Sequence, residues 1–277
     1  MKKPTAFWMT LAIVCVFAIS FVFSHTAGAS SGKPAVAAQA AILINAVNGE
    51  ILFAKKADRV MAPASTTKIM TAILGLERGD LGRTVTVSTN AAAKDGSSMH
   101  LACNQRITLR NLLYGVLLIS GNDAATAVAE YIAGSETAFA RLMNAKAIGL
   151  GMRNTRFQNA SGLPAVNHYS TAYDLALLTR YAMRNPNFAW IVQTKTYSMQ
   201  GNRPGERVQL INHNKLLWRY PYCTGVKTGY TIRAGGCLVS SAAKQGKQLI
   251  AVVLHSSAIY DDSQKLFEYG FKRLSPR

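Results

Sequence analysis

The order of secondary-structure patterns along the chain constrains its fold more than any other feature. Strand-like stretches at residues 40–45 and 50–54 flank an Asn48-Gly49 turn signal that predicts a hairpin. Stretches with apolar residues at helical spacing fill the middle of the chain, and strand-like stretches return after Tyr197. An antiparallel sheet that joins the two ends, with the intervening helices packed on it, accounts for this order.

The expected fold is therefore α+β, an α/β sandwich in which an antiparallel sheet is flanked by helices and carries a helical subdomain. Helices are expected at residues 65–77, 108–117, 123–131, 136–149, 171–184 and 263–274. The later strands are expected at residues 208–211, 225–229, 236–241 and 248–254, with a short strand at 84–87. A chain of 277 residues with 49% hydrophobic side chains can bury a large core.

The N-terminal segment has the pattern of an export signal. Two lysines precede an almost wholly apolar run at residues 6–23, and a small-residue cleavage site ends at Ala29. We expect a signal peptide at residues 1–29, cleaved after Ala29, and a mobile small-residue linker at residues 30–39. The apolar run is near the lower length of a spanning helix, so an uncleaved anchor is the alternative. Both interpretations predict an exported protein, in the cell wall or at the outer face of the cytoplasmic membrane.

The charge balance is strongly basic, with 31 Lys and Arg against 13 Asp and Glu and a formal net charge of +18. Outside the cell such a surface suits anionic wall polymers or a membrane surface. Nucleic acid is not an expected partner, because the cations are scattered and no nucleic-acid-binding motif is present. A solvated basic face, with wall polymer as a loose partner, is the favoured interpretation.

Cysteine and histidine give no metal signature. Removal of the signal takes away Cys15 and leaves Cys103, Cys223 and Cys237, an odd number, so at least one thiol is unpaired within the chain. A disulfide between Cys223 and Cys237 requires that they face each other on paired strands, and free thiols are favoured.

The spacing of these residues does not match a zinc site. The histidines His100, His168 and His213 are expected in loops or on the surface. No metal or cofactor is expected.

A serine and a lysine, Ser65 and Lys68, stand three residues apart at the start of an apolar helical pattern, with Pro63 just before it. On a helix these two positions share a face, so the hydroxyl and the amine can meet. A lysine can activate a serine nucleophile if its pKa is lowered by burial or by a second cation. Taken alone the pattern is weak, because Ser65 could be a helix cap and Lys68 a solvated charge.

Two further motifs strengthen the case: Ser120-Gly121-Asn122 after an apolar helix, and Lys227-Thr228-Gly229 within a strand. The three motifs in this order are the signature of penicillin-interacting serine enzymes. Between residues 40 and 271 the chain resembles the low-molecular-weight penicillin-binding proteins, specifically the D-alanyl-D-alanine carboxypeptidase family. The other matching stretches are residues 46–52, 96–99, 123–125, 159–164 and 266–271.

The resemblance implies a β-lactamase/transpeptidase-like fold, with residues 40–274 as a penicillin-binding catalytic domain. It implies hydrolysis of the terminal D-alanine from peptidoglycan pentapeptides, inhibition by β-lactams, and a role in cell-wall biogenesis and cell shape. In this scheme Ser65 attacks the penultimate D-alanine, Lys68 takes its proton, Ser120 relays a proton to the leaving amine, and Asn122 holds Lys68 or the substrate amide.

The resemblance also places substrate-binding groups on the strand of the third motif. Lys227 attracts the terminal carboxylate and favours a neutral Lys68, and Thr228 hydrogen-bonds the carboxylate. Gly229 lets substrate approach the strand. The backbone N–H groups of Ser65 and Tyr230 form the expected oxyanion hole.

Three departures from relatives concern recognition of the carboxylate. Tyr230 follows the third motif where histidine is frequent, and His213 precedes Asn214 where some relatives have arginine. Residues 254–258 contain no arginine, although some relatives place one there. Binding of the carboxylate therefore depends on Lys227 and Thr228, or on a cation that the sequence does not identify. Many relatives also continue into a small β-rich domain and an amphipathic helix, and neither is expected within this sequence.

Two alternatives use the same scaffold. A D,D-endopeptidase would differ only on the leaving-group side, and a non-turnover penicillin-sensing, wall-binding module would not need an activated serine. A class A β-lactamase requires a glutamate that activates water, and none of the six glutamates lies in a convincing loop motif.

Overall fold

The computed structural model describes residues 32–201 and 205–275. Residues Lys33–Arg277 form one compact unit. The predicted signal peptide lies outside the described residues. The end of the predicted linker is packed, not mobile: Val36 and Ala38 are buried, and the Ala37 and Ala38 amides donate to the Asp262 carboxylate, both at 2.9 Å.

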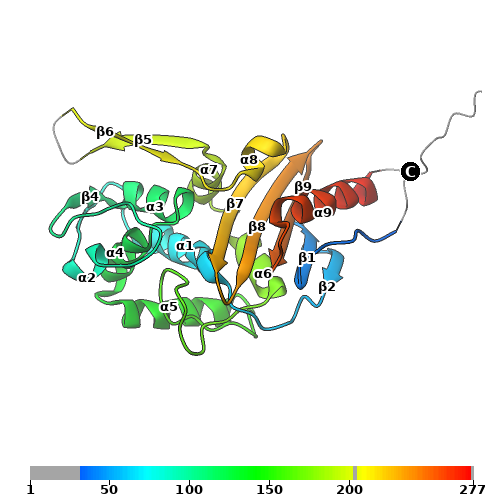
Figure 1. Cartoon of the computed structure of the whole chain (residues 1–277), viewed down its shortest axis with the longest axis horizontal. Coiled ribbons are helices and arrows are strands. Elements are labelled where there is room, and N and C mark those ends of the chain that lie inside the picture. The colour runs from blue at the N-terminus through cyan, green and yellow to red at the C-terminus, as the bar shows by residue number, and fades with distance from the viewer. Residues whose placement is uncertain (1–31, 202–204, 276–277) are drawn as a thin grey trace, which may run out of the picture. The chain divides into compact units, whose positions relative to one another are not determined.

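A five-stranded sheet in the order β2-β1-β9-β8-β7 forms the centre of the unit (Figure 1). Its strands are β1 (Ala40–Asn45), β2 (Ile51–Lys55), β7 (Cys223–Thr231), β8 (Gly235–Lys244) and β9 (Lys247–Leu254). Every pairing is antiparallel, and β1 pairs with β9 in a register that places Ile42 opposite Val252. The two ends of the chain therefore share one sheet, as the sequence predicted.

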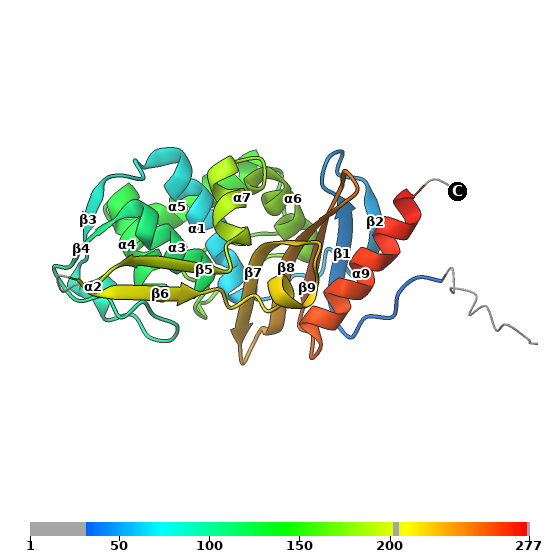
Figure 2. The ribbon, with the colours of Figure 1, turned by 90° about the horizontal axis from the view of Figure 1, so that it is seen from above.

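Successive side chains along a strand point to opposite faces of the sheet, and both faces are covered here, which explains why these strands are so apolar. Leu43 and Ala251 face α9 (Ile259–Leu274), whose Phe267 and Phe271 belong to the same apolar cluster. Ile42 and Val252 face the opposite way, into the larger cluster that includes α6 (Ala172–Ala182). Figure 2 shows α9 and α6 on opposite sides of the sheet.

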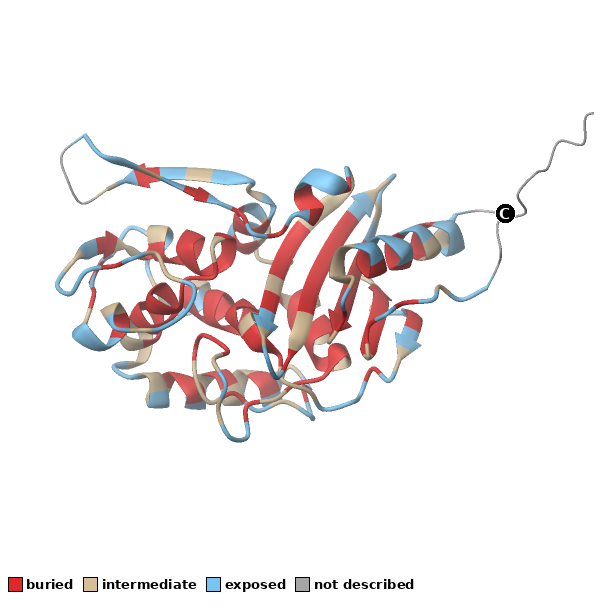
Figure 3. Cartoon of the chain, viewed as in Figure 1, coloured by how far each residue is buried: buried red, intermediate tan, exposed pale blue. Residues whose placement is uncertain are grey.

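The helical subdomain surrounds α1 (Lys68–Arg78), which is buried over its first eight residues, from Lys68 to Gly75 (Figure 3). Side-chain caps begin several of its helices: the Thr108 hydroxyl accepts from the Asn111 amide and the Ser135 hydroxyl from the Ala138 amide. The other elements here are η1 (Ala64–Thr67), β3 (Thr84–Thr86), α2 (Thr89–Ala92), β4 (Arg106–Thr108), α3 (Leu109–Leu118), α4 (Asn122–Ala133), α5 (Glu136–Gly149) and α7 (Pro186–Gln193).

The prediction that residues 208–211 join the main sheet is wrong. They form β6 (Arg207–Ile211), which pairs only with β5 (Thr196–Gln200) in a separate hairpin. β5 buries only Met199 and β6 buries only Leu210. Strands of the main sheet are covered on both faces, and these two strands have too few apolar side chains for such a position. The Tyr197 ring instead stacks on Tyr114 of α3, with 3.5 Å between ring centroids. A short helix, α8 (Leu216–Arg219), then leads into β7.

The three cysteines in the described residues are free. Cys237 is opposite Gly229 on β7, whereas Cys223 is opposite Ala242, so the two thiols stand far apart along the ladder. The favoured free-thiol interpretation is the one that the structure supports. Among the described residues, no helix is both long enough and apolar enough to cross a membrane.

Candidate active site

Ser65 lies in η1, one residue after a strained backbone position. Ala64 has φ 48°, and the carbonyl of Pro63 accepts hydrogen bonds from the Thr66 amide and hydroxyl at 3.2 and 2.7 Å. A Cβ at Gly162 would lie 1.9 Å from the Ala64 carbonyl oxygen, so only glycine lets that loop support the turn. The Ser65 side chain caps neither η1 nor α1, which excludes the purely structural interpretation of this serine as a helix cap.

Lys68 has no exposed surface and points its amine at three oxygen atoms. The distances from its Nζ are 3.1 Å to Ser65 Oγ, 2.7 Å to Asn122 Oδ1 and 2.6 Å to the Ser161 carbonyl oxygen. The amide and carbonyl oxygens only accept hydrogen bonds, whereas the serine hydroxyl can also donate. A neutral Lys68 would therefore use two N–H groups on Asn122 and Ser161 and direct its lone pair at the Ser65 hydroxyl.

The electrostatics favour that neutral form. Burial lowers the pKa of Lys68 well below its ordinary value, the charge of Lys227 lowers it further, and Asp123 opposes the shift. Burial also lowers the pKa of Lys227 to about 7. Two amines therefore share a poorly hydrated region, and the pKa of each lies below its ordinary value.

β7 brings the third motif against η1. Lys227 is buried and donates to the Thr228 carbonyl at 2.9 Å, while the Tyr230 side chain is 72% exposed. A Cβ at Gly229 would lie 3.0 Å from the Ser65 amide nitrogen and 3.2 Å from that of Thr66. Gly229 is therefore needed for the close approach of the serine turn, a reason different from the expected one of open access for substrate.

The second motif joins α3 to α4. Asn122 is held at both ends of its amide, because Nδ2 donates to the Asp95 carbonyl at 2.6 Å while Oδ1 accepts from Lys68. Ser120 has φ 64°, and its buried hydroxyl has no hydrogen-bond partner within the described residues. A buried hydroxyl without a partner is costly, so its retention here favours a role toward a bound molecule.

Three contributors to this site were missed in the sequence analysis. The Ser161 carbonyl is a backbone group and leaves no residue signature. Asp123 is fully buried, and its carboxylate accepts from Ser98 Oγ at 2.6 Å and from the Met99 and Leu101 amides at 2.9 and 3.1 Å. It fixes the 98–101 loop beside Asn122. The family resemblance included residues 96–99 and 123–125, but it did not indicate the hydrogen bonds between them.

The third contributor, His168, was expected in a loop or on the surface; it lies in a loop but is only 5% exposed. Its Nδ1 accepts from the Gln158 amide at 3.1 Å, so the proton is on Nε2, which donates to Thr67 Oγ1 at 2.9 Å. The ring thus ties the 158–168 loop to Thr67, the residue directly before Lys68. Burial, and secondarily the charge of Lys68, lower the pKa of His168 to about 4.

We expect this histidine to make the fold sensitive to acid. Because its folded pKa of about 4 lies below the ordinary 6.5, the unfolded chain binds more protons between these values. The free energy of unfolding should fall by about 3 kcal/mol as pH drops through that window. Urea unfolding at several pH values measures this, and His168→Asn should flatten the dependence. An unchanged slope in the variant would contradict the assignment.

Taken together, a serine beside a buried lysine, both next to the edge strand of an antiparallel sheet, defines the class of serine acyl-transfer enzymes with a lysine base. No group of three or more His, Cys, Asp or Glu side chains in the part of the chain that the structure describes could hold a metal ion.

Comparisons with known proteins agree with that class. A family model described as D-alanyl-D-alanine carboxypeptidase, peptidase family S11, matches residues 27–258. The chain is similar to D-alanyl-D-alanine carboxypeptidase DacF of Bacillus subtilis, with 37% identity over 99% of this chain and 72% of that protein. It therefore belongs to the D-alanyl-D-alanine carboxypeptidase family of serine peptidases.

Solved structures confirm the expected fold. The Streptomyces K15 DD-transpeptidase superposes with a TM-score of 0.82 at 35% identity, covering 87% of this chain and 99% of that one. A D-alanyl-D-alanine carboxypeptidase from Mycobacterium tuberculosis gives a TM-score of 0.84 at 32% identity, covering 90% and 96%. The penicillin-binding/transpeptidase fold predicted from the motifs is thus the fold of this chain.

Proposed function

We propose that this protein hydrolyses the terminal D-alanine from peptidoglycan pentapeptides through an acyl-enzyme on Ser65, and that β-lactams acylate the same serine. The observation that carries the proposal is the 3.1 Å contact between Ser65 Oγ and the fully buried Lys68 amine. Membership of the carboxypeptidase family supplies the substrate class.

The first step begins when neutral Lys68 takes the Ser65 proton as Oγ attacks the carbonyl carbon of the penultimate D-alanine. Negative charge develops on the carbonyl oxygen, and in our proposal the Ser65 and Tyr230 amides donate hydrogen bonds to it. Asn122 and the Ser161 carbonyl then stabilise the ammonium that Lys68 has become, since both accept its N–H groups.

The second step breaks the C–N bond, and the leaving amine needs a proton. In our proposal the Ser120 hydroxyl relays that proton from Lys68, because it is buried and without a partner among the described residues. Terminal D-alanine departs, and a water activated by the regenerated base hydrolyses the ester. Lys227 and Thr228 hold the terminal carboxylate during these steps, and no other cation is assigned to it.

The dependence of substrate capture on pH follows from Lys227. Its pKa of about 7 means that it loses its charge above that pH in the free enzyme. We expect kcat/KM for a peptide ending in D-Ala-D-Ala to fall above pH about 7, as carboxylate binding weakens. Steady-state kinetics from about one pH unit below to about three pH units above the Lys227 pKa of about 7 test this. In Lys227→Arg the side chain stays charged, so kcat/KM should no longer fall above pH about 7. If the fall persists in this variant, Lys227 is not the group that binds the carboxylate.

The proposed location is outside the cytoplasmic membrane. The N-terminal pattern and the net charge of +18 support export and a loose association with anionic wall polymers. A reporter fusion and N-terminal sequencing of the exported protein would test export and cleavage after Ala29.

An assay of product release tests the reaction itself. D-alanine release from a D-Ala-D-Ala peptide, without cleavage of a crosslinked peptide dimer, is expected. Cleavage of the dimer alone would favour the D,D-endopeptidase, and acylation by penicillin with neither product would favour the sensing module.

A further inference from the structure

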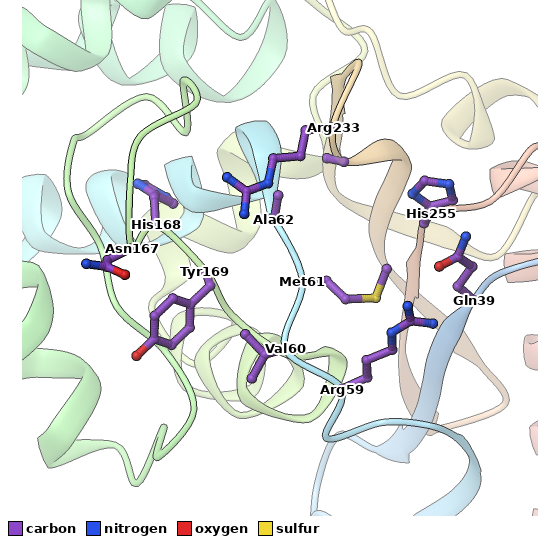
Figure 4. Close-up of a pocket in the computed structure, with 11 residues that line it drawn as sticks. Gln39, Arg59, Val60, Met61, Ala62, Asn167, His168, Tyr169, Arg233 and His255 are labelled. Carbon is purple, nitrogen blue, oxygen red and sulfur yellow. The ribbon is translucent and has the colours of Figure 1, made fainter.

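A cavity of about 380 Å³ lies beside the segment that leads to Ser65, separate from the Ser65–Lys68 pair (Figure 4). Its walls come from residues 59–62 before η1, residues 167–169, and residues 233–234 after β7. Gln39 and His255 close its far end. Its volume is within the range of small-molecule sites.

The cavity is basic and carries no counter-charge. Arg59, Arg233 and His255 line it, and none of the lining residues is acidic. Within the described residues, neither guanidinium takes part in an ion pair or in a side-chain hydrogen bond. Figure 4 shows Arg59 pointing toward Gln39 at one end, while Arg233 points toward His168 at the other. Two unpaired guanidinium groups facing one hollow favour an anion, because each can hold a carboxylate with two parallel hydrogen bonds.

The cavity continues toward the nucleophile. A smaller hollow shares Ala62, His168 and Arg233 with it and is also lined by Ala64 and Thr231. Arg233 therefore stands at the boundary between the large cavity and the residue that precedes Ser65.

The direction of β7 shows which part of a substrate would reach this point, and here the inference rests on the proposed function. Gly229 is level with Ser65, and Lys227 precedes it on the strand. If the terminal carboxylate lies at Lys227 and Thr228, the chain before the scissile bond must leave past Tyr230 and Thr231, toward Arg233. An extended peptide advances about 3.3 Å per residue, so a group two or three residues before the scissile bond reaches the end of β7.

We propose that this cavity is a subsite for a carboxylate on the acyl side of the substrate, two residues before the scissile bond. Arg233 is the contact nearest the nucleophile, and Arg59 extends the basic surface away from it. Arg233 does not replace the missing carboxylate-binding arginine, because it lies on the opposite side of Ser65 from Lys227.

The test uses two synthetic peptides ending in D-Ala-D-Ala that differ in one group: a free carboxylate or its carboxamide, two residues before the scissile bond. In the wild type, kcat/KM for the carboxylate peptide should exceed that for the carboxamide by about 10- to 100-fold. Arg233→Gln should bring that ratio close to one, and Arg233→Lys should retain part of it. Arg141→Gln, which removes an exposed arginine of α5, is the matched control and should keep the wild-type ratio.

The outcomes separate the two proposals. Equal rates for the two peptides in the wild type would overturn the subsite and leave the carboxypeptidase intact. D-alanine release from neither peptide would overturn the proposed function. A wild-type preference that survives in Arg233→Gln, with the variant still acylated by penicillin, would also overturn the subsite.

Discussion

Replacing Lys68 by alanine should slow acylation of Ser65 by penicillin by about 10³- to 10⁴-fold, the upper part of the range for a general base. The variant loses the amine 3.1 Å from Ser65 Oγ, and no other side-chain base contacts that oxygen within the described residues. It also leaves Asn122 Oδ1 and the Ser161 carbonyl without their donor. The rate constant for acylation, measured by intact mass against time, checks the prediction.

Lys68→Arg is the matched control, because it restores a buried cation but no base at neutral pH. Penicillin should acylate Lys68→Arg as slowly as it acylates Lys68→Ala. If arginine restored acylation, the charge of residue 68 and not its basicity would be what the reaction needs. The expected pH profile agrees with a base: the lowered pKa of Lys68 places the rise of the acylation rate well below the ordinary lysine range.

Asp123→Ala should have the largest effect on stability, lowering the free energy of unfolding by about 3–5 kcal/mol. The carboxylate is fully buried and accepts from a hydroxyl and two loop amides, so the substitution removes the acceptor of all three. Urea unfolding monitored by fluorescence measures the loss.

The same substitution tests whether Asp123 positions Asn122. Asp123 raises the pKa of Lys68, so its removal should move the acylation–pH profile toward lower pH. Asp95→Ala is a suitable control, because the hydrogen bond from Asn122 ends on the backbone carbonyl of Asp95, which the substitution keeps. A loss of stability with an unshifted profile would reduce Asp123 to a purely structural residue.

Much of this fold could be predicted from sequence where the signal was local and repetitive. The strand pair 40–45 and 50–54, the helix of Glu136–Gly149 and the β8–β9 hairpin follow from apolar alternation, helical spacing and turn residues. The short helices were missed because their signals are weak. Pro186–Gln193 exposes Trp190, and Leu216–Arg219 is a single turn.

The site could be predicted as a set of residue types but not as a network. Ser65, Lys68, Ser120, Asn122 and Lys227 stand out because three short motifs coincide in one chain. The Ser161 carbonyl, the Asp123 network and the His168–Thr67 bond arise from distant loops that fold against η1 and α4. The cavity at Arg59 and Arg233 joins segments far apart in sequence, and no local pattern links them.

The most direct test of the central claim is the intact mass of the protein after incubation with a penicillin, for the wild type and for Ser65→Ala. We expect one stable penicillin adduct on the wild type, located on Ser65 by peptide mapping, and none on the variant. Folded wild-type protein without an adduct, or an adduct that persists in Ser65→Ala, would contradict Ser65 as the nucleophile.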